Sequence, residues 1–107
     1  PAAKVLGTIV STPVDGLAVG DAGMKTNGND TGLPNVAGVD GAEVVYLSAE
    51  HFNIDLTHAA SELSVGEKVW FVPYDIAVTA NNFDYIMAAR DGQLAAILSV
   101  TARGIYR

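Results

Sequence analysis

The chain has 107 residues, half of them hydrophobic, and carries 6 Lys and Arg against 12 Asp and Glu, a formal net charge of −6. This length fits one domain, and the apolar content excludes a disordered tail. The acidic balance argues against nucleic acid or an anionic membrane as the main partner, and the lack of cysteine excludes disulfides and thiolate chemistry.

Seven short segments are rich in β-branched residues or alternate apolar with polar residues, which is typical of strands. In chain order they are residues 4–11, 17–21, 43–48, 52–56, 68–72, 85–90 and 93–101. Asp-Gly dipeptides, which favour tight turns, stand before or between them at Asp15-Gly16, Asp40-Gly41 and Asp91-Gly92. The last of these dipeptides predicts the clearest hairpin of the chain, between residues 85–90 and 93–101.

The intervening segments predict loops and short helical turns. Residues 22–41 hold five of the eleven glycines, and we expect a long loop there, which in a compact domain is often functional. Residues 76–83 fit one or two helical turns. The whole pattern predicts a mostly β fold, a single small antiparallel β-barrel or sandwich over residues 1–107. Four aromatic residues are expected in its core or at the core's edge: Trp70, Phe71, Tyr74 and Tyr85.

A few polar side chains could carry chemistry. Lys25 lies in the glycine-rich segment, where it is either solvated or functional, and Glu50-His51 ends a strand, either as a surface pair or as part of a site. Asp75 follows a buried strand and could bind a hard cation, but one carboxylate is a poor metal site. From chemistry alone, a helix-capping role of Asp75 is favoured.

Six segments occur in an order and spacing that together resemble a known family. They are Asp21–Lys25, Asp30–Pro34, Leu47–His51, Val65–Val69, Val72-Pro73 and Ala102–Gly104. The resemblance is to the C-terminal β-domain of the D-threonine aldolase and D-serine dehydratase family, and it runs from Val5 to Gly104. It implies D-configured β-hydroxy amino acids as substrates, pyridoxal 5′-phosphate held on a lysine of a separate barrel-shaped domain, and a divalent metal supplied by the β-domain.

The resemblance also implies a role for this chain. A (β/α) barrel takes about 250 residues, so we expect no catalysis and no cofactor binding by this chain alone. We expect a β-domain that closes the active site of a lyase's barrel domain, with an exposed apolar patch where that domain docks. The side chains expected to face substrate and cofactor are Asp21, Lys25, Glu50, His51 and Asp75. Lys25 and His51 would orient carboxylate or phosphate groups.

The metal site is where the sequence departs from the family. The resemblance implies a histidine after the Val-Pro step and, two residues on, a cysteine or aspartate, whereas this chain has Asp75 and Ala77. Asp75 could remain a metal or water ligand, but Ala77 has no donor atom, and only Asp84 could compensate. No metal bound by this chain alone is therefore expected.

The missing ligand and the short chain leave a second hypothesis open. It is a free-standing, non-catalytic binding or assembly module that has lost the metal site. Such a module would either self-associate or hold a small molecule or partner protein in residues 22–41. An independent metal hydrolase would need clustered ligands that the sequence does not show. The first residues lack the pattern of a signal peptide, so a cytoplasmic setting is the default expectation, with no nucleic-acid or membrane partner.

Overall fold

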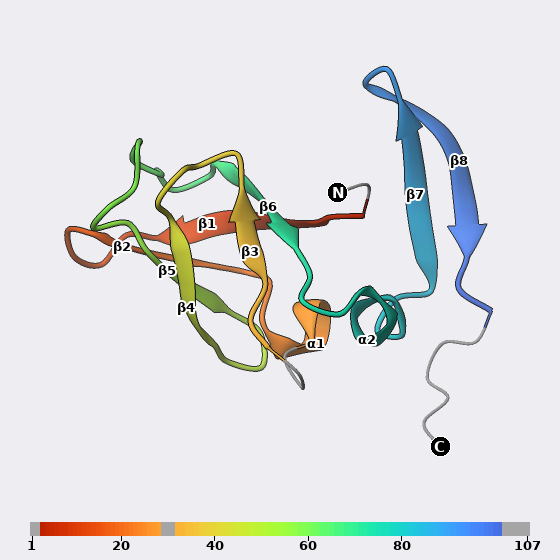
Figure 1. Ribbon diagram of the computed structural model, residues 1–107, viewed down its shortest axis with the longest axis horizontal. Coiled ribbons are helices and arrows are strands. Elements are labelled where there is room, and N and C mark those ends of the chain that lie inside the picture. Colours follow the sequence, from red (N-terminus) through yellow and green to blue (C-terminus); the bar gives the residue numbers. More distant parts are fainter. Residues whose placement is uncertain (1–2, 29–31, 102–107) are drawn as a thin grey trace.

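The computed structural model of the chain describes residues 3–28 and 32–101. These residues form eight strands and two short helices (Figure 1), which confirms the predicted mostly β fold. The strands are β1 Val5–Ser11, β2 Leu17–Gly20, β3 Asn35–Ala37, β4 Glu43–Leu47, β5 Phe52–Asp55, β6 Lys68–Val72, β7 Tyr85–Arg90 and β8 Gln93–Ser99; the helices are α1 Met24–Asn27 and α2 Ile76–Ala80. No helix in this part of the chain is long and apolar enough to cross a bilayer.

Six strands form one antiparallel sheet in the order β3-β6-β1-β2-β5-β4. Its two outer strands, β3 and β4, approach each other, so the sheet curls into a nearly closed barrel. The other two strands, β7 and β8, pair only with each other and stand beside the barrel as a two-stranded ribbon (Figure 1). Helix α2 connects the barrel to this ribbon.

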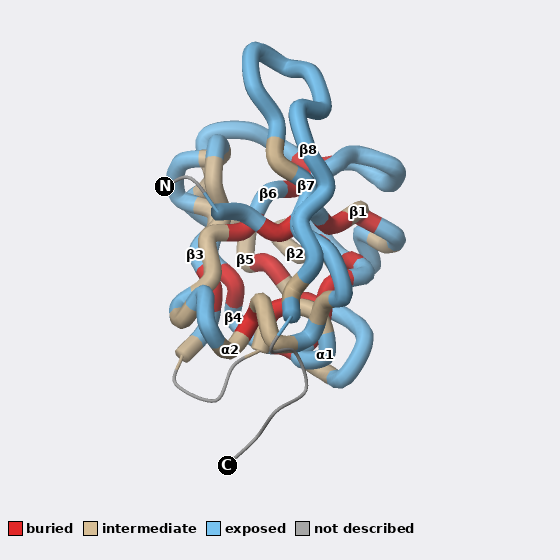
Figure 2. Tube along the Cα trace, turned by 90° about the vertical axis from the view of Figure 1, so that its right-hand side faces the viewer, coloured by how far each residue is buried: buried red, intermediate tan, exposed pale blue. Residues whose placement is uncertain are grey.

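The barrel interior is filled by aromatic rings from opposite strands. Alternation along β5 and β6 turns Phe52 and Phe71 inward. Their rings pack edge to face, with 4.8 Å between the ring centroids. Glycines on the neighbouring strands leave room for the rings, because a Cβ at Gly20 would lie 1.9 Å from the Phe52 ring and a Cβ at Gly7 2.9 Å from it. Figure 2 shows the buried residues gathered in the barrel strands, whereas the ribbon is exposed.

Two expectations need correction. The segment 22–41 is not one long loop, because it contains α1 and β3, and β3 pairs with β6 although its three residues carry no strand pattern. Of the four aromatic residues expected at the core, Phe71 is buried, whereas Trp70, Tyr74 and Tyr85 are 47 to 65% exposed. Trp70 precedes Phe71 on β6, so the two side chains point to opposite faces of the sheet.

Candidate functional site

Two segments that are distant in the sequence meet at one end of the barrel. Residues 21–25 run from the end of β2 into α1, and residues 48–51 form the turn between β4 and β5; we call these two segments the rim. The backbone N–H of Met24 donates to the carbonyl of Ser48 at 2.8 Å, and the N–H of Lys25 donates to the carbonyl of Ala49 at 3.1 Å. The first turn of α1 therefore sits directly on the β4–β5 turn.

A glycine and a serine make this close approach possible. A Cβ at Gly23 would lie 2.3 Å from the carbonyl oxygen of Ser48 and 2.5 Å from the nitrogen of His51, so only glycine fits between the two backbones. The Ser48 hydroxyl closes the turn, because it accepts a hydrogen bond from the backbone N–H of His51 at 3.1 Å. The positions of the rim side chains are thus fixed by backbone contacts.

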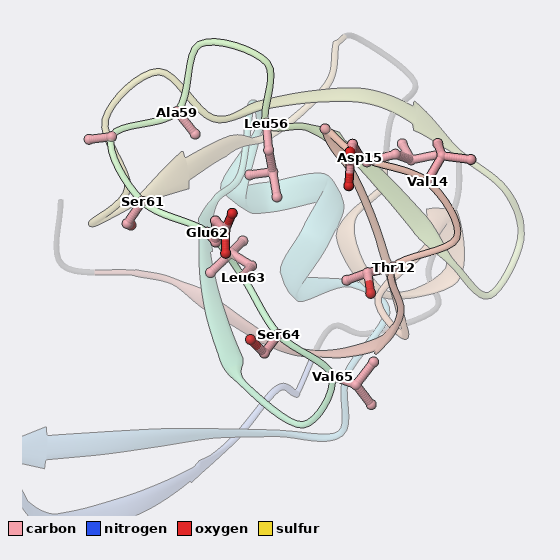
Figure 3. A pocket seen from close by; sticks show the side chains of 13 residues that line it. Thr12, Val14, Asp15, Leu56, Ala59, Ser61, Glu62, Leu63, Ser64 and Val65 are labelled. Atoms are coloured by element: carbon pink, nitrogen blue, oxygen red, sulfur yellow. The ribbon is translucent and has the colours of Figure 1, made fainter.

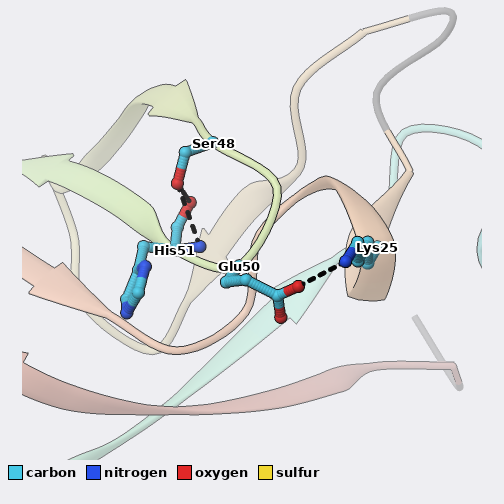
Figure 4. Close-up of polar contacts among 4 residues, drawn as sticks. All are labelled: Lys25, Ser48, Glu50 and His51. Atoms are coloured by element: carbon cyan, nitrogen blue, oxygen red, sulfur yellow. Dashed lines mark hydrogen bonds and ion pairs between the residues drawn. The ribbon is translucent and has the colours of Figure 1, made fainter.

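The rim holds an ion pair that points outward. The Lys25 ammonium lies 2.7 Å from a carboxylate oxygen of Glu50, and both side chains are largely exposed (Figure 4). The hydrogen bond and the charge of Glu50 raise the pKa of Lys25 above its ordinary value, and Lys25 lowers the pKa of Glu50 in the same way. An exposed pair adds little stability, so the Lys25 ammonium is directed towards Glu50 while it stays open to solvent.

The other two expected rim residues are arranged differently. The His51 ring turns away from the Lys25–Glu50 pair, although it belongs to the same turn (Figure 4). The Asp21 carboxylate accepts a hydrogen bond from the backbone N–H of Thr8 at 2.8 Å, and the Asp21 N–H donates to the Thr8 carbonyl at 3.1 Å. Asp21 therefore fastens the rim to β1.

Asp75 lies on the neighbouring helix. It is the N-cap of α2, and one carboxylate oxygen accepts from the backbone N–H groups of Ala77 at 3.0 Å and Val78 at 3.4 Å. Helix α2 is tied to α1 by the buried Thr79, whose hydroxyl donates to the Asn27 carbonyl. The structure thus brings Asp21, Lys25, Glu50 and His51 to the rim and places Asp75 at the start of α2, where its carboxylate caps that helix.

The donors near Asp75 do not fit a metal ion. Its carboxylate caps α2, and Ala77 offers no donor atom. The part of the chain that the structure describes holds no group of three or more His, Asp or Glu side chains that could share a metal ion.

Comparison with known proteins now decides the family. The model of a family described as "Putative serine dehydratase domain" matches residues 2–89. The chain belongs to this family. The resemblance seen in the sequence is therefore confirmed, although the first two residues of its segment 30–34 and the whole of its segment 102–104 lie outside the described residues.

Members with known functions are much longer than this chain. It is 33% identical over 100 residues to the 3-hydroxy-D-aspartate aldolase of Paracoccus denitrificans, covering 94% of this chain and 25% of that protein. It is 29% identical over 103 residues to a D-threonine aldolase of an Arthrobacter species, covering 96% of this chain and 27% of that protein. The solved D-threonine aldolase of Filomicrobium marinum superimposes with a TM-score of 0.87 at 32% identity, over 94% of this chain and 28% of that one. The chain thus spans about a quarter of the length of these relatives.

One hollow of the domain lies away from the rim. It has a volume of about 500 Å³ and is lined by the β1–β2 turn, by Leu56 and by residues 59–65, with the side chain of Leu63 among them (Figure 3). Strands β2 and β5 run between the two places, since Leu17 borders the hollow while Gly20 borders the rim. None of the five candidate side chains lines this hollow.

Three residues that position the rim and α2 were not singled out from the sequence: Ser48, Asn27 and Thr79. Ser48 begins the β4–β5 turn, and serine hydroxyls at the start of a turn often accept from a backbone N–H a few residues on, so this role could be recognised from the sequence. The Asn27–Thr79 contact spans 52 residues, and no local pattern predicts it. Asn27 also donates to the Ala22 carbonyl at 2.8 Å, which makes it the buried link between the rim and α2.

Proposed function

We propose that these 107 residues act as the accessory β-domain of a pyridoxal-phosphate-dependent lyase for D-configured β-hydroxy amino acids. Family membership and the names of the relatives support the substrate class, because both aldolases act on such compounds. The quarter-length match supports a division of labour in which a larger, barrel-shaped domain holds the cofactor. The cofactor, when bound there, supplies the electron sink for bond cleavage. This domain covers the active site and does not catalyse by itself.

The observation that carries the proposal is the exposed ammonium of Lys25 at the rim. The backbone N–H of Lys25 bonds to the β4–β5 turn, its ammonium pairs with Glu50, and its side chain remains 71% exposed. A positioned ammonium facing another domain suits a substrate carboxylate or a phosphate, because charge-assisted hydrogen bonds are the stronger ones. His51 extends the same turn, and we propose that it borders the substrate on the other side.

The remaining two candidates receive supporting roles. Asp21 holds the rim against β1, and Asp75 sets the start of α2, so both act by positioning the backbone. Asp75 caps α2 and Ala77 has no donor atom, so we propose that this domain supplies no metal ion as a Lewis acid. Its contribution is to bind the anionic end of the substrate and to exclude water from the reacting atoms.

A chimera tests this function. This chain replaces the matching 28% of the Filomicrobium marinum D-threonine aldolase, and D-threonine is titrated against the cofactor's absorbance. We expect saturable binding, acetaldehyde release above that of free cofactor, and no dependence of that release on Mn²⁺. Lys25→Ala should raise the half-saturating D-threonine concentration about tenfold or more, because a hydrogen bond to a charged group is lost.

Lys68→Ala is the matched control, since Lys68 bonds to the Thr8 hydroxyl on the outside of the barrel at 2.9 Å. A folded chimera that holds cofactor but binds no D-threonine would refute the proposal. Equal effects of Lys25→Ala and Lys68→Ala would refute the role of Lys25.

The alternative of a free-standing binding or assembly module is favoured by one observation, the helix-capping use of Asp75 beside Ala77. It predicts that the isolated chain self-associates at micromolar concentration or gains thermal stability from a small ligand. Sedimentation of the isolated chain distinguishes the two proposals. A monomer that binds D-threonine only within the chimera contradicts the module.

A further inference from the structure

The β7–β8 ribbon is the part of the described chain that the barrel leaves uncovered. Its strands pair with each other from Tyr85–Ser99 to Arg90–Gln93, and all but Ala88 of their residues are exposed. The turn is a tight one, with positive φ at Asp91 and Gly92. A two-stranded ribbon with both faces in water is marginally stable at best. A surface that packed on this ribbon would therefore stabilise it.

Both faces of the ribbon are apolar. Residues paired across the two strands share a face, so Met87 and Ile97 lie on one face, and Ile86 and Leu98 lie on the other. These four side chains are 44 to 75% exposed. A strand that rests on a core with one face normally presents polar residues on its other face. Apolar residues on both faces are typical of strands covered from both sides.

The exposed apolar area of the ribbon is divided between its two faces. With ordinary side-chain areas, its six large apolar residues expose roughly 600 Å² summed over both faces, so a partner must contact both faces to bury all of it. A stable interface buries about 800 Å² on each partner, which the ribbon and its flanking residues can supply. Its strands also lack the lysines and prolines that protect free sheet edges in soluble proteins.

The solved relative has enough further chain to cover the ribbon. The Filomicrobium marinum aldolase matches 94% of this chain with a TM-score of 0.87, so it holds most of the same ribbon in the same position. The matched part is 28% of that chain, which leaves nearly three quarters of it to make further contacts. We propose that the ribbon is inserted into the larger domain of such a polypeptide, which covers both of its faces. This inference rests on the proposed function, and it assigns the docking element to the ribbon.

Amide hydrogen exchange tests the insertion. In the isolated chain, the amides of β7 and β8 should exchange rapidly, because all residues of the two strands except Ala88 are exposed. In the chimera with the aldolase, the same amides should exchange at least about tenfold more slowly. Met87→Lys on one face and Ile86→Lys on the other should each abolish this protection.

Two controls separate docking from folding. Val65→Lys changes a side chain with 61% exposure at the β5–β6 turn, and it should leave the exchange of the ribbon unchanged. The two ribbon variants should also leave the thermal midpoint of the isolated chain unchanged, because their side chains are exposed there. If the chimera does not fold, the same lysines are placed at the aligned positions of the aldolase itself.

Equal exchange of the ribbon in the isolated chain and in the chimera would overturn the inference. Sensitivity to lysine on one face alone would also overturn it, because insertion requires both faces. The proposed function fails in a different way. A chimera with a protected ribbon and no binding of D-threonine refutes the function alone, whereas a chimera that binds D-threonine with an unprotected ribbon refutes the docking alone.

Discussion

The contact between α1 and the β4–β5 turn predicts a strong effect of Gly23→Ala. The new Cβ would lie 2.3 Å from the Ser48 carbonyl oxygen, so the two backbones must separate by about 1 Å to restore ordinary contact. The Met24–Ser48 hydrogen bond is 2.8 Å long and the Lys25–Ala49 bond 3.1 Å, and such a separation breaks both. At about 1 kcal/mol each, the loss is about 2 kcal/mol, or about 10 °C in the thermal midpoint.

The assay joins thermal unfolding with an NMR titration of Glu50. Once α1 moves, Lys25 no longer holds Glu50, so the lowered pKa of Glu50 should rise towards its ordinary value. Gly66→Ala is the control, since a Cβ there meets open space but φ is +92°. It should lower the thermal midpoint through backbone strain and leave the pKa of Glu50 unchanged. An unchanged midpoint and an unchanged Glu50 pKa in Gly23→Ala would refute the docking of α1.

Three further predictions concern single contacts. Thr79→Val should lower the free energy of unfolding by about 1–2 kcal/mol in urea titrations, because the buried Asn27 carbonyl loses its donor, whereas Thr79→Ser should retain most of the stability. Glu50→Gln should return the pKa of Lys25 towards its ordinary value in NMR titrations. Because folding lowers the pKa of Glu50, its carboxylate stabilises the folded state above the pKa of the unfolded chain, and this stabilisation disappears on acidification. The free energy of unfolding of Glu50→Gln should therefore fall less on acidification than that of the wild type. Asp75→Ala should lower the free energy of unfolding by about 1 kcal/mol, because the cap of α2 is lost. Mn²⁺ should leave the thermal midpoints of the wild type and of this variant unchanged. A shift in the wild type alone would reveal a metal site.

Local patterns predicted the elements whose side chains alternate or whose turns need special residues. The alternation of Phe52 and Ile54 marked β5, and Asp91-Gly92 marked the β7–β8 turn. Strand β3 was missed because it has three residues and is a strand only through pairing with β6. Helix α1 was missed because its four residues are held by the β4–β5 turn rather than by helix propensity.

The sequence drew attention to the candidate side chains one by one, but it did not predict how they are arranged. The glycine-rich setting of Lys25 and the strand end before Glu50 drew attention to both, yet their ion pair depends on a tertiary contact. The capping role of Asp75 could be foreseen, because aspartate before a helix is a common cap. The direction of His51 could not, since it depends on the Ser48 hydroxyl that closes the turn.

The aromatic filling of the barrel has a consequence for how such a domain changes over evolutionary time. The packing of Phe52 and Phe71 against Gly7 and Gly20 stabilises the barrel from within. None of the five candidate side chains belongs to this hydrophobic core. Exchanging the side chain at position 75 or 77 therefore removes no member of this core. A lineage can lose, regain or exchange chemistry on the outside while inheriting the same inner structure.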